Sequence, residues 1–157
     1  MPLSPGDLAP SFSMVADTGD IISSASLKGQ LFVLYFYPKD DTSGCTAEAC
    51  QFRDLLPNFS KIDVPVFGVS RDNTNSHRLF KEKYQLPFVL LSDEDGSVCQ
   101  SYNVWVEKSM YGRKYFGIER STFLIDSQGI IAAVWHKVKV PDHAQEVLKT
   151  LNDFIKQ

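Results

Sequence analysis

The pattern of apolar and polar residues divides the chain into alternating strands and helices. Its strongest feature is an unbroken apolar run at 31–37, rich in aromatic residues and bounded by Gly29 and Pro38. Such a run is typical of a strand buried on both faces, as in the interior of a parallel sheet. Other apolar segments predict strands at 12–15, 21–22, 64–70, 88–91, 121–125 and 130–135.

Several segments have the spacing of helices. One should begin near Ser43 and run to about Leu56, where Pro57 predicts a kink or a fresh start. Apolar residues at helical spacing predict further helices over 73–84, after a turn at 93–96, and from Pro141 onward. The aromatic-rich stretch 103–119 suits a packed loop and an edge strand.

Turn signals complete the prediction of the fold. Residues 17–20 and 126–129 both read as hairpin turns. A βαβα order that ends in a hairpin and a helix predicts an α/β fold, with a central mixed sheet flanked by helices and an N-terminal hairpin extension. At 157 residues, we expect 1–157 to form a single domain.

Composition narrows the functional classes. The net charge of -3 gives no basic footprint, which argues against nucleic acid as a partner. No apolar run approaches the roughly 20 residues that span a bilayer, and residues 1–7 do not resemble a signal peptide. The chain has three cysteines, and an odd number argues against a full disulfide framework in a secreted protein. We therefore expect a cytoplasmic protein with no membrane partner.

Cys45 is the leading candidate for chemistry. The predicted helix start places it in the first turn, where free N–H groups and the helix dipole stabilise a thiolate. The polar loop before it predicts that the thiol faces an opening, and the Thr42 hydroxyl can point at the same place. Cys50 lies five residues later. The alternative is a buried cysteine that only fills space, the commoner role of a lone cysteine.

Other reactive residue types fit ordinary structural roles. His77, His136 and His143 are scattered and Cys45/Cys50 lacks a second pair of ligands, so we expect no metal site. Cys99 lies in a mixed apolar helix, which favours packing. We expect Trp105 and Trp135 to pack, and the basic cluster of Lys108, Arg113 and Lys114 to be a solvated loop.

The motif Pro38-x-x-x-Thr42-x-x-Cys45 resembles the active-site sequence of peroxiredoxins. A second cysteine five residues later, here Cys50, is similar to the pattern of the PrxQ, or bacterioferritin comigratory protein, subgroup. The segments Gly6-Asp7-x-Ala9-Pro10-x-Phe12, 90–93 and 120–126 are similar to other blocks of the family. The resemblance spans nearly the whole chain. It implies an AhpC/TSA-type domain with a thioredoxin-like fold that reduces hydrogen peroxide and alkyl hydroperoxides with thiols.

The resemblance also implies roles for individual residues. Cys45 would be the peroxidatic cysteine and Cys50 the resolving one; the subgroup's alternative resolving position is empty, since 73–85 contain no cysteine. Arg120 would lie beside the sulfur as a permanent cation, and Thr42 would help to hold the peroxide. Pro38 would shape the loop and shield the sulfur. Glu48 either steers Arg120 or lies on a solvated helix face.

The enzyme implied needs no cofactor and would be recycled by thioredoxin or a similar dithiol. Two alternatives stay open: a thiol–disulfide oxidoreductase, although C-x-x-C is the usual motif there, and a redox-sensing binding domain. The chain ends soon after its final predicted helix, which favours a monomer.

Helix geometry adds one prediction about the two cysteines. Residues five apart in a helix have Cα atoms roughly 8.6 Å apart and point to different faces, whereas a disulfide needs less than about 7 Å. Cys45 and Cys50 can therefore bond only if the helix unwinds between Ser43 and Cys50.

Overall fold

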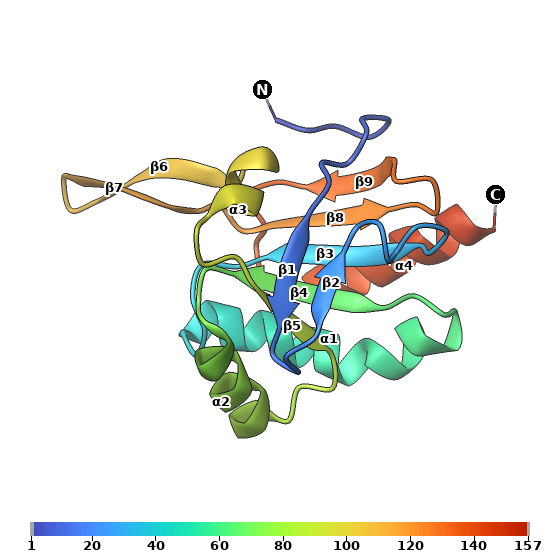
Figure 1. Ribbon diagram of the computed structural model, residues 1–157, viewed down its shortest axis with the longest axis horizontal. Coiled ribbons are helices and arrows are strands. Elements are labelled where there is room, and N and C mark those ends of the chain that lie inside the picture. Colours follow the sequence, from blue (N-terminus) through green and yellow to red (C-terminus); the bar gives the residue numbers. More distant parts are fainter. Residues whose placement is uncertain (1, 157) are drawn as a thin grey trace.

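A seven-stranded mixed sheet forms the centre of the protein, in the order β2-β1-β5-β4-β3-β8-β9 (Figure 1). The structure is a computed structural model that describes residues 2–156. The strands of this sheet are β1 (Ser13–Ala16), β2 (Ile21–Ser23), β3 (Phe32–Phe36), β4 (Val66–Ser70), β5 (Val89–Ser92), β8 (Ser121–Ile125) and β9 (Ile131–Trp135). Strands β3, β4 and β5 run parallel, and β1, β2, β8 and β9 pair antiparallel on either side.

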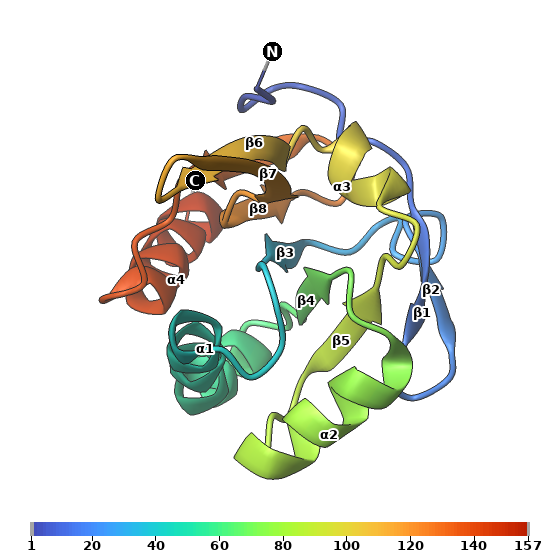
Figure 2. The ribbon, with the colours of Figure 1, turned by 90° about the vertical axis from the view of Figure 1, so that its left-hand side faces the viewer.

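Four helices accompany the sheet. They are α1 (Ser43–Lys61), α2 (Thr74–Tyr84), α3 (Ser97–Ser101) and α4 (His143–Ile155). Figure 2 shows α1, α2 and α4 along one side of the sheet, with α3 and the N-terminal segment on the other. This arrangement confirms the predicted α/β fold with a central mixed sheet.

Strand β3 separates two hydrophobic cores, because side chains alternate between the two faces of a strand. Val33 and Tyr35 point into the core that α1, α2 and α4 cover. Phe32, Leu34 and Phe36 point into the core beneath α3 and the N-terminal segment. All five residues of β3 are buried, as the apolar run predicts.

The N-terminal extension is tied to the sheet at both ends. Strands β1 and β2 form the predicted hairpin, and β1 pairs with β5. Further along the lead-in, Gly6 N–H donates to Ile131 O (2.8 Å) and Ile131 N–H to Asp7 O (2.9 Å). The lead-in thus covers the start of β9, which would otherwise be an open edge.

Two predicted elements differ from the structure. Helix α1 does not end near Leu56 but continues through Pro57 to Lys61, because fully buried Phe59 extends its packing against the sheet. The missing N–H of Pro57 costs one helical hydrogen bond, which that burial offsets.

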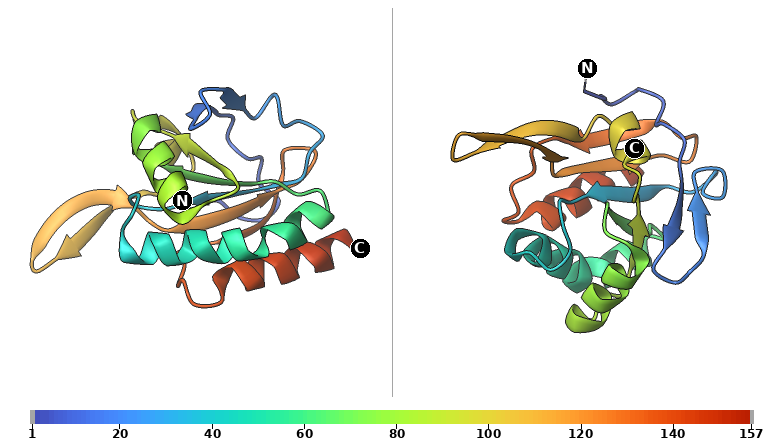
Figure 3. Two further views of the ribbon diagram at one scale, coloured as in Figure 1. Left: turned by 90° about the horizontal axis from the view of Figure 1, so that it is seen from below. Right: turned by 60° about the vertical axis from the view of Figure 1, so that its left-hand side comes forward.

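Residues 103–119 form a two-stranded ribbon, not a loop with an edge strand. Strands β6 (Trp105–Met110) and β7 (Arg113–Ile118) pair with each other and not with the central sheet. The ribbon extends away from the body of the protein, as the left view of Figure 3 shows.

Within residues 2–156, every helix falls short of the length and apolarity that a bilayer span requires.

Candidate active site

The loop between β3 and α1 places Cys45 at the end of the parallel strands. Thr42 occupies the N-cap position with extended backbone, and the first helical bond runs from Thr46 N–H to Thr42 O (2.8 Å). Cys45 therefore lies in the first turn, where the predicted helix start placed it. The Thr42 hydroxyl donates to Lys39 O (2.9 Å) and makes no cap hydrogen bond to the helix.

Arg120 reaches the sulfur from another part of the sheet. It immediately precedes β8, whose Ser121 pairs with Phe36 at the end of β3. This register brings Arg120 Nη2 to 3.3 Å from Cys45 Sγ. The guanidinium therefore places a permanent positive charge and an N–H donor beside the sulfur.

The polar loop predicts that Cys45 faces an opening, but the structure shows that it does not. Its side chain is only 1% exposed and belongs to the core between the sheet and α1. The loop is polar, but Cys45 is turned inward because it shares the buried face of α1 with Ala49 and Phe52. The Cys45 sulfur therefore lies at the boundary between an apolar core and Arg120.

Glu48 lies on α1 one turn after Cys45 and is completely buried, so it is not on a solvated helix face. Its Oε1 accepts a hydrogen bond from Arg120 Nη1 at 2.7 Å. Burial outweighs the attraction of Arg120 and raises the pKa of Glu48 to about 7. Arg120 thus connects two acidic groups, the thiol of Cys45 and the carboxyl of Glu48.

Gly44 leaves the space that Arg120 occupies. A Cβ atom at this position would lie 3.1 Å from Arg120 Nη2. Any larger residue would press on the guanidinium that contacts the sulfur.

Pro38 lines a pocket of about 390 Å³ beside the β6–β7 ribbon. The lining residues also include Trp105, Tyr115, Phe116 and Ile118 of the ribbon. Lys108 also lines this pocket, and its Nζ donates to Ile118 O. Lys108 is half-buried on β6, so it is not part of a solvated loop. Burial, followed by the nearby Arg120, lowers the pKa of Lys108.

Cys50 is on the same helix as Cys45 and is half-buried. All three cysteines are free thiols. Both candidate thiols thus lie in one uninterrupted helix, the arrangement in which helix geometry forbids a bond between them.

Comparison with known proteins identifies the family. The AhpC/TSA family model matches residues 5–134. Peroxiredoxin Bcp of Bacillus subtilis is 47% identical over 148 residues, which is 94% of each chain. Peroxiredoxin Bcp of Escherichia coli is 43% identical over 97% of each chain. The chain belongs to the AhpC/TSA family. Within it, the chain is a peroxiredoxin of the PrxQ/BCP subgroup.

Solved structures agree with this assignment. PrxQ of Xylella fastidiosa, in a cysteine-to-serine variant, superimposes with a TM-score of 0.92 at 39% identity over 99% of each chain. The bacterioferritin comigratory protein of Xanthomonas campestris, studied for alkyl peroxide reduction, gives 0.88 at 39% identity over 98% of each chain. The fold of this peroxiredoxin is therefore thioredoxin-like, and the protein is a peroxidase.

Tyr35 is a residue of this peroxiredoxin that sequence reasoning missed. Its ring stacks on Phe52 of α1 (4.7 Å between centroids), and its hydroxyl is buried without a hydrogen-bond partner among residues 2–156. Burial, with Glu48 and Cys45 nearby, raises the pKa of Tyr35 well above its ordinary value. In the sequence, Tyr35 is one aromatic among several in an apolar run.

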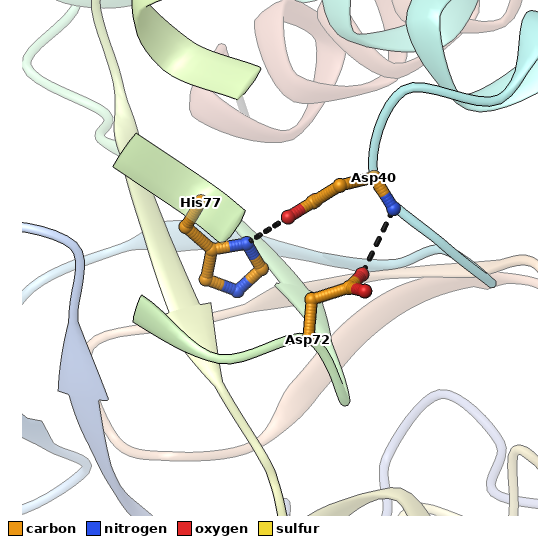
Figure 4. Close-up of side chains that lie close together, drawn as sticks. All are labelled: Asp40, Asp72 and His77. Atoms are coloured by element: carbon orange, nitrogen blue, oxygen red, sulfur yellow. Dashed lines mark hydrogen bonds and ion pairs between the residues drawn. The ribbon is translucent and has the colours of Figure 1, made fainter. Parts of the chain in front are cut away.

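A buried polar cluster beneath the active-site loop was also missed. The carboxylates of Asp40 and Asp72 and the imidazole of His77 lie together, with their polar atoms within 4.8 Å of one another (Figure 4). These atoms hydrogen-bond protein partners, so we describe the cluster as a hydrogen-bond network. The sequence pattern did not predict this cluster, because Asp40 and His77 are 37 positions apart.

Proposed function

We propose that this peroxiredoxin reduces hydrogen peroxide and organic hydroperoxides through attack by the Cys45 thiolate. The observation that carries the proposal is the 3.3 Å contact between Arg120 Nη2 and Cys45 Sγ in the first turn of α1. A further support is the relative from Xanthomonas campestris, whose structures concern alkyl peroxide reduction.

The first step transfers one oxygen atom. The thiolate of Cys45 attacks the terminal oxygen of the peroxide and the O–O bond breaks, which gives a sulfenic acid. The leaving alkoxide, or hydroxide from hydrogen peroxide, takes a proton from solvent. Arg120 stabilises the charge as it moves from sulfur to the leaving oxygen. The Thr42 oxygen can accept a hydrogen bond from the peroxide while its own O–H donates to Lys39 O, and Pro38 shields the sulfur.

The second step forms a disulfide. The Cys50 thiolate attacks the Cys45 sulfenic acid, the S–O bond breaks, and the hydroxide that leaves takes a proton from solvent to become water. The two cysteines lie in one helix, so this step requires the start of α1 to unwind. Peroxide attack then uses the wound form and disulfide formation the unwound form.

The third step restores the thiols. Thioredoxin or a similar dithiol reduces the Cys45–Cys50 disulfide and becomes oxidised in exchange. Cysteine thiols supply all the electrons, so the cycle needs no metal or organic cofactor. We place this cycle in the cytoplasm, where thiols are kept reduced, and we propose that the enzyme acts as a monomer.

Two variants test the division of roles. Cys45→Ser should abolish peroxide consumption, whereas Cys50→Ser should consume about one equivalent and then stall as a sulfenic acid. Consumption can be followed with thioredoxin, thioredoxin reductase and NADPH. Normal turnover by Cys45→Ser would refute the assignment of the nucleophile.

A further inference from the structure

Asp40 anchors the loop that carries Pro38 and Thr42. Although it is a charged residue, it is only 7% exposed. Its N–H donates to Asp72 Oδ2 at 2.8 Å, and its carboxylate accepts hydrogen bonds from Ser76 Oγ at 2.8 Å and Tyr37 OH at 2.5 Å. The loop is therefore held against α2 through one buried side chain, two residues before the N-cap of α1.

His77 completes this anchor from α2. Its Nδ1 lies 2.7 Å from Asp40 Oδ2. Figure 4 shows the ring turned toward this carboxylate. Its Nε2 lies 2.9 Å from Leu91 O on β5. The ring is fully buried, so water does not replace either contact.

The hydrogen-bond partners determine how many protons the ring carries. A carbonyl oxygen only accepts, so Nε2 must hold a proton to bond Leu91 O. A proton must also lie between Nδ1 and Asp40 Oδ2. Both Asp40 oxygens already accept hydrogen bonds, Oδ2 from Ser76 and Oδ1 from Tyr37, so the ring supplies this second proton. The geometry corresponds to a buried imidazolium–carboxylate pair.

The other groups around the ring favour its positive charge. From the residue after β3, Tyr37 OH lies 3.5 Å from Nδ1 and donates its hydrogen bond to Asp40. From the segment after β4, the Asp72 carboxylate adds a second negative charge within 4.8 Å. From β5, the carbonyl of Leu91 faces the ring. The nearest cations of α2 itself are engaged elsewhere: Arg78 bonds Asp17 O, and Lys81 bonds the Asp17 carboxylate.

We propose that His77 is a positioning residue of the peroxidase: its proton, held by Asp40, fixes the 37–42 loop and keeps the start of α1 wound around Cys45. Loss of the proton would leave the Nδ1 lone pair facing a carboxylate oxygen, and the loop would be released. The released state favours the unwound helix, so His77 sets the balance between peroxide attack and disulfide formation. This inference rests on the proposed roles of Cys45 and Cys50.

The protonation of the ring can be measured without reference to activity. Imidazole nitrogen-15 spectra of the reduced protein in the peroxidase assay buffer, assigned with His77→Gln, should show a proton on both His77 nitrogens, as the contacts with Asp40 and Leu91 require. In Asp40→Asn the side-chain amide can donate to a bare Nδ1, so that nitrogen should lose its proton. An unprotonated Nδ1 in the wild-type protein would overturn the proposal, whatever the peroxidase assays show.

The consequence for α1 needs a local measurement. In the reduced protein, Asp40→Asn and His77→Gln should speed hydrogen exchange of the amides 46–52 by about tenfold, the loss expected for a hydrogen bond to a charged group. Amides of β3 and β8 should keep their protection. In rapid mixing, the same variants should react more slowly with peroxide and then form the disulfide faster.

Asp41→Asn is the matched control. Asp41 is the next residue of the same loop and also contacts α2, through Lys83 Nζ (2.8 Å) and Tyr84 OH (2.6 Å), but these contacts are exposed. This variant removes the same charge and should leave exchange at 46–52 near the wild-type rate. Equal loss of protection across the whole sheet in Asp40→Asn, or an equal effect of Asp41→Asn, would refute the positioning role.

Discussion

Cys45 and Cys99 are both buried near the start of a helix, yet their surroundings are opposite in charge. Cys45 Sγ contacts the guanidinium of Arg120 at 3.3 Å. Cys99 lies in α3 next to the Asp93 carboxylate, which accepts the N–H groups of Val98 (3.1 Å) and Cys99 (2.8 Å). Both side chains are 1% exposed or less, so burial does not distinguish them.

The difference lies in the group that each sulfur meets. Burial, and then the hydrogen bond to Asp93, raises the pKa of Cys99 well above its ordinary value and keeps it a thiol. At Cys45, Arg120 provides a compensating charge that a buried thiolate requires. The two buried cysteines thus differ in the sign of the charge beside them, and we expect this difference to set their reactivity.

The largest effect should follow from removing the cation that distinguishes the two sites. Arg120→Met would leave Cys45 buried without a positive partner, as Cys99 is. Peroxide attack should slow by about 100-fold or more, as when one transition-state donor is removed. The measurement is the rate of the first oxidation in rapid mixing.

Arg113→Met is the control for this change, because it removes the same charge from an exposed position on the ribbon. It should react at the wild-type rate. If the two variants behaved alike, the contact between Arg120 and the sulfur would not explain the reactivity of Cys45.

The next effect concerns the stability of the fold and follows from Glu48, the acid that shares Arg120 with Cys45. Glu48 has its pKa raised from 4.5 to about 7. Between these values the folded protein holds a proton that the unfolded chain releases, so this group's contribution to stability is full below pH 4.5 and is lost as the pH rises through about 7. At about 1.4 kcal/mol per pH unit, the loss amounts to about 3 kcal/mol.

The Glu48→Gln variant has no carboxyl group at this position, so it should not lose this part of its stability as the pH rises. Urea unfolding from about pH 4 to about pH 8 should show a free energy of unfolding that falls less steeply with pH in the variant than in the wild-type protein. Parallel curves for the two proteins would show that Glu48 ionises normally in the folded state.

The smallest effect should follow from changing the inert cysteine. Cys99→Ser retains a small polar side chain and removes a thiol that stays protonated, so peroxide turnover should match the wild-type rate. In the folded wild-type protein, mass spectrometry after alkylation should find Cys99 unlabelled when Cys45 is labelled. Rapid labelling of Cys99, or slow turnover by the variant, would contradict the comparison.

Much of the fold followed from local pattern. The apolar run at 31–37 predicted β3 because burial on both faces requires an unbroken apolar sequence, and the polar loop after it predicted the start of α1. The predicted end of the helix near Pro57 was wrong because a local pattern does not include tertiary packing. The burial of Phe59 outweighed the helix-breaking effect of Pro57. The ribbon was missed because its strands pair only with each other and expose most of their side chains.

The sequence by itself determined the family, through a motif whose residues lie within eight positions of one another, and the place of Cys45 at the start of a helix. Only the tertiary structure decided which charges meet the thiol and the loop. Arg120 and Cys45 are 75 positions apart, and His77 and Asp40 are 37 apart. Apolar periodicity specifies which residues are buried, but the register between β3 and β8 and the packing of α2 specify which polar groups are buried together.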